Sequence, residues 1–364
     1  MSFVQGHGVV PKGERYDRSF LVLDQSKKYK RTELGDFIYS SNNLETGSIG
    51  INKTGKAVIS PVYSIFYGVS IGDSQFIGIM SLLPRFIAKM IRFRQGVVYG
   101  QWRIHEKDFL DISILIPSEA ERTKITKLIL SIEELITLHQ RKLNNLKLKK
   151  KALLQKLFPK NGKRYPELRF PGFTDAWEQR KLDNIAKIKT GGGTPKTTNL
   201  EYWSGDIPWI QSSDLVEGDV VHVNIKKFID NNALKNSAAK LISRDSIALV
   251  TRVGVGKVAV INQDFTTSQD FLSLSDFDGN DIKFIAYQLF RLMQENAKVL
   301  QGTSIKGISK TDLIEQSIAI PNSIKEQNLI ASLLSQTDSI ITLHQRKLDH
   351  LQLQKKALLQ QMFV

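Results

Sequence analysis

An eight-residue segment occurs twice in the chain without a change. Residues 136–143 and 341–348 both read ITLHQRKL, and the match resumes as KKALLQ at residues 150–155 and 355–360. The interval of roughly two hundred residues is far longer than the period of a solenoid repeat, so the repeat indicates duplication of a whole module.

Each copy carries apolar residues at the a and d positions of a heptad, which predicts a long helix that packs along a coiled-coil seam. At 1.5 Å per residue, each helix would be about 45–50 Å long. The predicted seam residues are Ile136, His139, Leu143, Leu146 and Leu153 in the first copy, and Ile341, His344, Leu348, Leu351 and Leu358 in the second.

The polar exceptions in the seam are repeated as well. His139 matches His344, and Lys150 matches Lys355. A polar seam residue specifies register and partner at some cost in stability, and the alternative is that duplication simply copied both residues. A metal site is the least favoured interpretation, because two lone histidines have no third ligand nearby.

The chain is strongly basic, with 51 Lys and Arg against 36 Asp and Glu and a formal net charge of +15. This excess favours a polyanionic partner, nucleic acid ahead of a membrane surface, over a basic but inert surface. Residues 141–169 hold eleven basic residues and one acidic residue, so we expect the first copy of the helix to lie nearer to phosphates than the second.

Composition excludes several classes of protein. The absence of cysteine excludes disulfides and thiolate zinc sites. No stretch approaches the roughly 18 apolar residues of a membrane span, and the N-terminus lacks the form of a secretory signal. We therefore expect a cytoplasmic protein with no membrane partner and about two to three domains.

Residues 35–75 and 205–275 are rich in Ile, Val, Phe and Tyr between turn breaks, which predicts α+β globules of mixed β structure with short helices. Each long helix follows the same lead-in, a strand at 112–116 or 316–320 that a proline closes. Matching amphipathic stretches at 76–92 and 281–299 precede these lead-ins. Three prolines and two glycines make residues 159–173 a non-helical linker.

Motifs for catalysis are missing. The glycine run at 191–193 lacks the Lys-Ser/Thr of a phosphate loop. Residues 254–257 (GVGK) come closer, but the apolar runs on both sides favour a hairpin turn. No Asn/Asp-Pro-Pro-Tyr run and no nuclease-like carboxylate cluster is present. We expect no catalytic residues, no metal and no cofactor.

The polar loops contain residues suited to reading DNA. Asn, Gln and Arg can make bidentate contacts to base edges, and Ser, Thr and Lys suit phosphates; the alternative for each residue is a loop that is simply solvated. The candidates are Ser40, Ser41, Asn42, Asn43 and Arg103 in the first globule, and Lys196, Thr197, Gln211, Ser212, Ser213, Arg252, Gln269, Ser304 and Lys306 in the second.

Together these features resemble the specificity subunit of type I restriction-modification systems. The resemblance rests on residues 176–182 (AWEQRKL), 191–195 (GGGTP), 207–210 (IPWI), 320–321 (IP) with 326–327 (EQ), and the two LHQRKL helices. It covers residues 174–364 as a full repeat. It implies two target-recognition domains separated by two long helices that form an antiparallel coiled coil, each globule reading one half of a bipartite site in double-stranded DNA.

The resemblance also implies partners. The helices would dock two modification (methyltransferase) subunits, and the full complex would recruit restriction subunits, so methylation and cleavage belong to other chains. The expected domains are 1–115 (first target-recognition domain), 116–158 (central helix), 159–173 (linker), 174–320 (second target-recognition domain) and 321–364 (C-terminal helix).

The first globule departs from the family pattern. Its strand entry at residues 35–38 (GDFI) comes early in the chain, whereas the second globule takes nearly seventy residues from Trp177 to its equivalent at 245–247. Either the first domain is a shortened type or the chain is N-terminally truncated, and we favour truncation. A truncated subunit would read only the half-site of its second domain.

Helix length suggests a ruler for the unread spacer. A rod of about 45–50 Å spans roughly fourteen base pairs at 3.4 Å each, so deleting residues 143–149 and 348–354 should shorten the spacer. The competing hypotheses are a non-catalytic coiled-coil adaptor that binds proteins and an unrecognised enzyme. A steep fall of affinity with salt would favour DNA binding over the adaptor.

Overall fold

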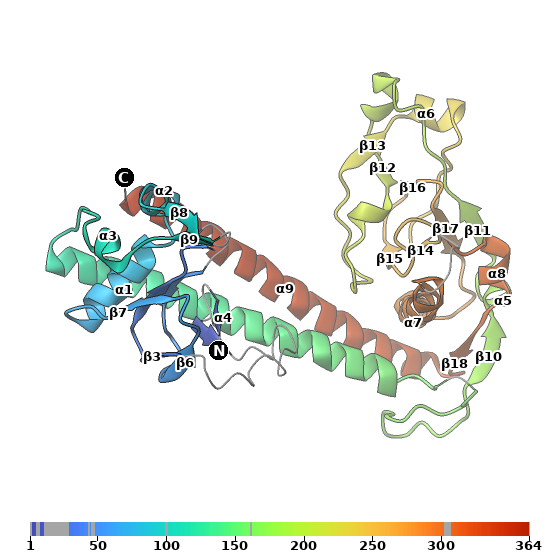
Figure 1. Cartoon of the computed structure of the whole chain (residues 1–364). Helices are drawn as coiled ribbons and strands as arrows, with labels where there is room; N and C mark the ends of the chain where they lie inside the picture. Colours follow the sequence, from blue (N-terminus) through green and yellow to red (C-terminus); the bar gives the residue numbers. More distant parts are fainter. Residues whose placement is uncertain are drawn as a thin grey trace. The chain divides into compact units, whose positions relative to one another are not determined.

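The computed structural model divides the chain into two compact units, one of residues 1–138 with 348–364 and one of residues 139–347 (Figure 1). Each unit includes one end of a pair of long helices. The structure describes residues 2–4, 8–10, 29–42, 44, 48–98, 101–160, 162–301 and 307–363.

Short antiparallel strands build most of the first unit. Its central sheet has the strand order β5 (Ile49–Ile51), β4 (Phe37–Tyr39), β7 (Ser64–Phe66). The two-stranded pairs are β1 (Ser2–Val4) with β2 (Gly8–Val10), β3 (Lys30–Thr32) with β6 (Ala57–Ile59), and β8 (Gln95–Val98) with β9 (Gln101–Arg103). The short helices are α1 (Ile71–Met80), α2 (Pro84–Ile91) and α3 (Glu106–Leu110).

The amphipathic stretch expected at residues 76–92 is two helices, not one. Pro84 occupies the first turn of α2. Proline has no N–H and clashes with the preceding turn, so a helix can begin but not continue at this position. Ahead of the break, Gly78 brings α1 against β5, since a Cβ there would lie 2.7 Å from Ile51 Cγ2.

The second unit is built on a four-stranded antiparallel sheet in the order β11 (Ile188–Gly191), β17 (Phe271–Ser275), β14 (Ser246–Val250), β15 (Val258–Ile261). Every residue of β14, β15 and β17 is buried. The hairpin expected at residues 254–256 is confirmed, because β14 pairs with β15 and both glycines have positive φ (89° and 109°).

A smaller mixed sheet holds β13 (Lys227–Ile229), β12 (Ile207–Ile210) and β16 (Thr266–Thr267), with β12 parallel to β16. A separate pair joins β10 (Glu178–Lys181) to β18 (Ser317–Ile320). The short helices are α5 (Leu182–Ile185), η3 (Leu200–Trp203), η4 (Ser212–Asp214), α6 (Asn231–Asn236) and α8 (Lys310–Ile314), and α7 (Ile282–Gln301) is longer.

The lead-in strand expected at residues 112–116 is wrong, although its counterpart forms β18. Residues 112–118 have no regular secondary structure. β18 is a strand because the EQRK segment of β10 pairs with it over four residues. No described residue in the first unit supplies a matching strand, and an extended segment without a partner has no ladder to join.

Two helices far longer than the rest follow the lead-ins, α4 (Glu119–Lys156) with 38 residues and α9 (Ile324–Met362) with 39. At 1.5 Å per residue each is about 57–59 Å long, more than the 45–50 Å expected. The difference arises because both helices begin within three residues of their proline. There Ser118 Oγ and Ser323 Oγ accept backbone N–H groups of the first turn.

The two long helices pack antiparallel. In the second unit, Nδ1 of His139 lies 2.8 Å from Nδ1 of His344. The ammonium of Lys150 forms an ion pair with Asp338. Residues 139 and 150 of α4 thus lie opposite residues 344 and 338 of α9, so the two chain directions are opposed. The α+β fold agrees with the sequence pattern, and the antiparallel coiled coil agrees with the family resemblance.

The pairing has the symmetry of the sequence repeat. His139 and His344 are 205 residues apart and contact each other, so the local two-fold axis of the helix pair passes between them. In the first unit, Lys355 Nζ lies 2.7 Å from Glu133 Oε1. The same interval of 205 residues that separates the histidines also separates Lys150 from Lys355 and Glu133 from Asp338. The two ion pairs are therefore repeat equivalents.

The predicted seam residues all lie at least half-buried. Leu143 and Leu348, which are repeat equivalents, are almost completely buried. The half-buried members are Ile136, His139, Leu146, Leu153, Ile341, His344, Leu351 and Leu358. Burial and the neighbouring His139, Lys142 and Lys347 lower the pKa of His344, which favours its neutral form. At 2.8 Å between the two Nδ1 atoms, one ring donates the hydrogen bond and the other accepts it.

Among the residues that the structure describes, no helix has both the length and the hydropathy needed to cross a bilayer. No group of three or more His, Asp or Glu side chains in the same residues is arranged to hold a metal ion.

Asp338→Ala should destabilise the protein strongly. The side chains of Lys150 and Asp338 are 6% and 1% exposed, so the variant leaves a buried ammonium without its counter-ion, at a cost of about 3–5 kcal/mol. Urea denaturation would measure the change. The repeat-equivalent variant Glu133→Ala is the matched control and should cost less, since its partner Lys355 is 22% exposed and can be hydrated. Equal losses would contradict this account.

Candidate nucleic-acid interface

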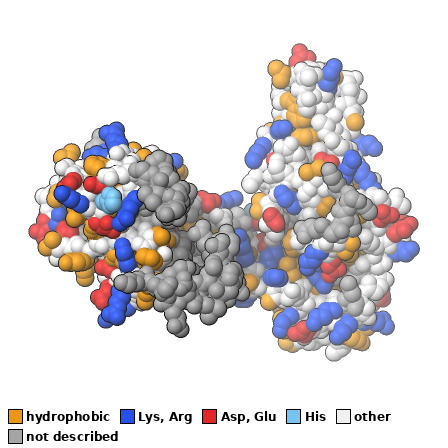
Figure 2. Space-filling model, in the orientation of Figure 1, with side chains coloured by type: hydrophobic (Ala, Val, Ile, Leu, Met, Phe, Trp, Pro, Cys, Tyr) orange, Lys and Arg blue, Asp and Glu red, His pale blue; other side chains and the backbone are white. Residues whose placement is uncertain are grey.

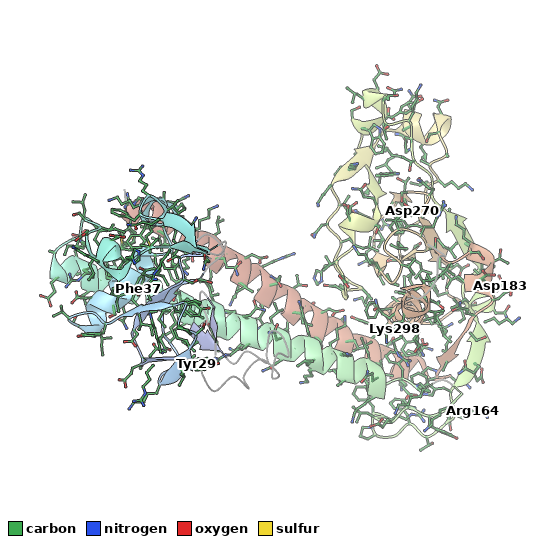
Figure 3. The ribbon with its side chains drawn as sticks, viewed as in Figure 1. Tyr29, Phe37, Arg164, Asp183, Asp270 and Lys298 are labelled. Atoms are coloured by element: carbon green, nitrogen blue, oxygen red, sulfur yellow. The ribbon has the colours of Figure 1, made fainter. Side chains whose placement is uncertain are left out.

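Three polar loops converge on one side of the second unit. The glycine run after β11 lies against residues 267–268, where a Cβ on Gly192 would fall 2.0 Å from Ser268 O. Thr194 Oγ1 donates a hydrogen bond to Gln269 Oε1. The glycines are therefore required for close contact between backbones, not for holding a phosphate. Figure 3 labels Asp270 at the second of these loops.

The third loop follows β14 and joins the same group. Thr251 N–H donates to Asp270 O at 2.8 Å, and Ile308 N–H donates to Thr251 O at 2.8 Å. These backbone bonds fix the position of Arg252, which is exposed. The loops are thus held by their main chains, which leaves their outer side chains available for a ligand.

Lys310 lies against the glycine run, since a Cβ on Gly191 would fall 2.2 Å from Lys310 Nζ, and the charges of Lys240 and Arg252 act on it. Burial, followed by the positive charges of Lys240 and Arg252, lowers the pKa of Lys310. Among the described residues, no carboxylate forms an ion pair with any of the three. Like charges held close together favour a bound anion, and the phosphates of a nucleic acid fit this requirement.

A second basic feature combines cations with aromatic rings. Trp203 and Trp209 meet edge to face, with centroids 5.0 Å apart, and the ammonium of Lys227 lies 5.6 and 5.4 Å from their centroids. A cleft of about 440 Å³ opens beside Trp203, lined also by Thr197, Leu200, Lys226 and Phe228. Aromatic faces interleaved with lysines are typical of surfaces that hold nucleic acid.

Charge is otherwise dispersed. Figure 2 shows Lys and Arg mixed with Asp and Glu over the visible face of the second unit, with no single large basic patch. The Lys240–Arg252–Lys310 cluster and the cleft beside Trp203 are therefore the two candidate anion-binding features of this unit.

The candidates in the second unit fall into two groups. Lys196, Thr197, Ser213, Arg252 and Gln269 are exposed, and Gln211 and Ser212 are half-buried. Ser212 O accepts from Lys257 Nζ at 2.9 Å, and Gln211 N–H donates to Asp214 Oδ2 at 2.9 Å. The half-buried pair therefore also shapes its own loop. Ser304 and Lys306 lie outside the described residues.

The first unit supports fewer of its candidates. Ser40 and Ser41 are buried, 2% and 8% exposed, and Ser41 Oγ accepts the Ile104 N–H at 2.9 Å, so both are poorly placed to touch DNA. They extend β4 into the core, where a small hydroxyl satisfies a buried backbone donor. Asn42 is half-buried and Arg103 is exposed. Asn43 lies outside the described residues.

Lys227, Lys240 and Lys310 are not among the DNA-binding residues expected from the sequence. Lys227 precedes Phe228 in β13 and faces the tryptophans, so a basic–aromatic pattern in a strand was an available signal. Lys240 and Lys310 are 70 residues apart, and only the fold brings the charge of Lys240 close enough to act on Lys310. No local pattern marks them.

Known proteins match this chain in sequence and in fold. The family model described as "Type I restriction modification DNA specificity domain" matches residues 174–353, about half of the chain. The MjaIX type I specificity subunit of Methanocaldococcus jannaschii is 32% identical over 169 residues, which cover 45% of this chain and 38% of that protein. The EcoR124I/EcoR124II specificity subunit of Escherichia coli is 30% identical over 170 residues, covering 45% and 41%. The chain belongs to the type I specificity-subunit family.

The likeness in fold extends further along the chain. The crystal structure of a type I system S subunit from M. genitalium covers 93% of this chain and 84% of its own, with a TM-score of 0.66 at 12% identity. At that identity the match shows the fold alone. In sequence, the matched segments span about two fifths of the first two relatives.

Lys310→Ala should flatten the salt dependence of DNA binding. Each lost phosphate contact lowers the slope of log affinity against log salt by about 0.9 on duplex DNA. Fluorescence anisotropy with a labelled duplex over a range of salt would measure the slope. Lys187→Ala is the control, because Lys187 already pairs with Asp278 at 3.0 Å and should contribute little. An unchanged slope for Lys310→Ala would remove the cation cluster from the interface.

Proposed function

We propose that this type I specificity subunit reads a bipartite sequence in double-stranded DNA, one half with each globule, and that its helix pair sets the spacer between the halves. The observation that carries the proposal is the contact of His139 with its own repeat equivalent His344. A two-fold axis through the helices supports a two-fold arrangement of the modules that the repeat duplicated.

The proposed division of the chain follows the sequence: target-recognition domains at 1–115 and 174–320, helices at 116–158 and 321–364, and a linker at 159–173. The linker is bound to its surroundings, since Arg169 makes bidentate contacts to Glu326 at 2.7 and 2.9 Å. This contact supports a fixed position of the linker against α9, between the central helix and the second globule.

The proposed DNA contacts in the second globule are Lys196, Thr197, Ser213, Arg252 and Gln269, joined by Lys227, Lys240 and Lys310. In the first globule Arg103 is the best-exposed candidate. If the first globule does not read bases, the subunit would recognise only the half-site of its second domain, which is the alternative form of the proposal.

We infer that the partners are two modification subunits, with restriction subunits in the full complex, and that methyl transfer and cleavage belong to those chains in the cytoplasm. Exposed apolar side chains on the helices support docking at two equivalent places. They occur as repeat equivalents with similar exposure: Leu135 and Ile340 (45% and 44%), Leu138 and Leu343 (45% and 53%), and Leu148 and Leu353 (66% and 65%). Contiguous exposed apolar residues mark interaction sites.

Because the helices are antiparallel, a test of whether helix length sets the spacer needs deletions that lie opposite each other. Deleting 143–149 and 348–354 would cut one helix opposite an uncut stretch of the other. Deleting 136–142 and 341–347, which are centred on the two histidines, keeps Lys150 opposite Asp338 and Lys355 opposite Glu133. This centred deletion should shorten the gap in the methylated motif by about three base pairs, since seven residues rise about 10.5 Å.

Mapping of methylated adenines in cells that carry the deleted chain with its modification subunit would measure the gap. The off-centre deletion is the comparison and should lower methylation, because the shortened helices can keep either the His139–His344 contact or the two ion pairs but not both. An unchanged gap after the centred deletion would exclude a ruler.

Leu138→Asp combined with Leu343→Asp should prevent capture of the modification subunit. Both leucines are already about half exposed, so the variant should fold while losing apolar contact area. Co-purification of the modification subunit would be measured. Asn145→Asp with His350→Asp, at exposed polar repeat positions on the same helices, is the control and should leave capture intact. If the leucine variant still captures the modification subunit fully, the docking surface does not include Leu138 and Leu343.

A further inference from the structure

Each repeated ion pair of the helices also binds its globule. In the second unit, Lys150 Nζ donates to Gly218 O at 2.5 Å, in the segment between η4 and β13. Tyr287 of α7 donates its hydroxyl to Asp338 Oδ2 at 2.7 Å. The pair that joins the two helices thus reaches two separate elements of the globule.

The repeat-equivalent pair does the same in the first unit. Glu133 accepts from Lys355 and from Lys53, which lies just after β5 in the globule. Burial raises the pKa of Glu133, but the two lysines outweigh burial and hold it below its usual value. Both globules therefore contact the helix pair at one shared repeat position, which is Asp338 in the second unit and Glu133 in the first.

Copying by duplication does not explain these contacts. Duplication accounts for the charges on the helices, but the groups that meet them from the globules differ in kind. A carbonyl and a phenol serve the second unit, and an ammonium serves the first. The two globules therefore use different chemical groups to contact equivalent charged residues of the helix pair.

Stability alone is a poor reason for such pairs. A buried ion pair often contributes no more than apolar side chains of the same volume, and its best-attested use is to specify geometry. The second globule also packs on Leu154 of α4 and on Leu157 and Phe158, which directly follow that helix. That apolar contact is non-directional, so it does not fix the orientation of the globule. The hydrogen bonds of Lys150 and Asp338 are directional, and they fix both the orientation of the globule and its position along the helices.

The contacted segment leads directly to the polar loops. Beside Gly218, Asp219 Oδ2 accepts from Thr342 Oγ1 of α9 at 2.9 Å and lies 2.8 Å from His222 Nδ1. Further back along the chain, the same segment begins at Ser212 and Ser213 in η4. Ser212 Oγ lies against Gly254, beside Arg252. The helix charges and the candidate DNA-reading loops are thus linked by one short stretch of chain.

We propose that Lys150 and Asp338, with their repeat equivalents Lys355 and Glu133, are positioning residues that fix each recognition globule on the helix pair and so hold the gap between the half-sites to a single length. This inference rests on the proposed bipartite reading. Without these anchors each globule still binds DNA, but its distance from the other varies.

The test replaces the buried pair by Lys150→Met with Asp338→Leu. This double variant removes the directional contacts without leaving a buried charge, so the fold is expected to persist. In cells carrying the chain with its modification subunit, the half-site sequences should stay the same while gaps one base pair shorter or longer appear. In the purified complex, hydrogen exchange should quicken in residues 215–222 and stay unchanged in β14 and β17.

Lys156→Met with Glu167→Leu is the control, since this exposed ion pair, 3.1 Å long, also involves α4 and should affect neither measurement. A single unchanged gap in the Lys150 variant, with lower total methylation only, would reduce the pair to an ordinary structural contact and overturn the proposal. If the unaltered chain gives no split motif, the bipartite function fails. The positioning role of Lys150 and Asp338 is then tested by hydrogen exchange alone, and unchanged hydrogen exchange in residues 215–222 would refute it.

Discussion

The antiparallel packing of α4 against α9 is the constraint on which the rest of the structure depends. A coiled-coil seam needs a register, and here the register is set where His139 meets His344 and Lys150 meets Asp338. Since the first contact joins repeat equivalents, the helix pair has a two-fold axis that the globules do not need to share. The two-fold symmetry is thus a property of the helix pair, whereas the two globules contact that pair through different groups.

The two ion pairs show how equivalent positions can differ in chemistry. Glu133 has two lysine partners, and they hold its pKa below the usual value against the effect of burial. Burial of Asp338 outweighs Lys150 and Tyr287, so its pKa is raised. A lowered carboxyl pKa stabilises the fold at neutral pH and loses this effect on acidification, whereas a raised one favours the fold toward lower pH. The first pair is therefore the more acid-sensitive.

Features that depend on local pattern were predictable from the sequence. The heptads gave the helices and their seam, Gly254 and Gly256 marked the hairpin, and prolines marked the linker. Features that depend on a distant partner were not. The segment at 112–116 (ISILI) is as apolar and β-branched as β18 (SIAI), but it lacks a strand to pair with. Ser40 and Ser41 look like loop hydroxyls but are buried, and only the fold brings the charge of Lys240 close enough to act on Lys310.

The central claim is that the two helices pair within one chain about the histidines. Because the chain has no cysteine, His139→Cys with His344→Cys introduces the only two thiols. A short thiol-reactive cross-linker should join them inside a single chain, whereas Lys149→Cys with Lys347→Cys, about 20 Å apart along the helices, should stay unlinked. Intramolecular cross-linking at 139 and 344 is the predicted result. Cross-links that form only between separate chains would contradict the pairing and the two-fold account built on it.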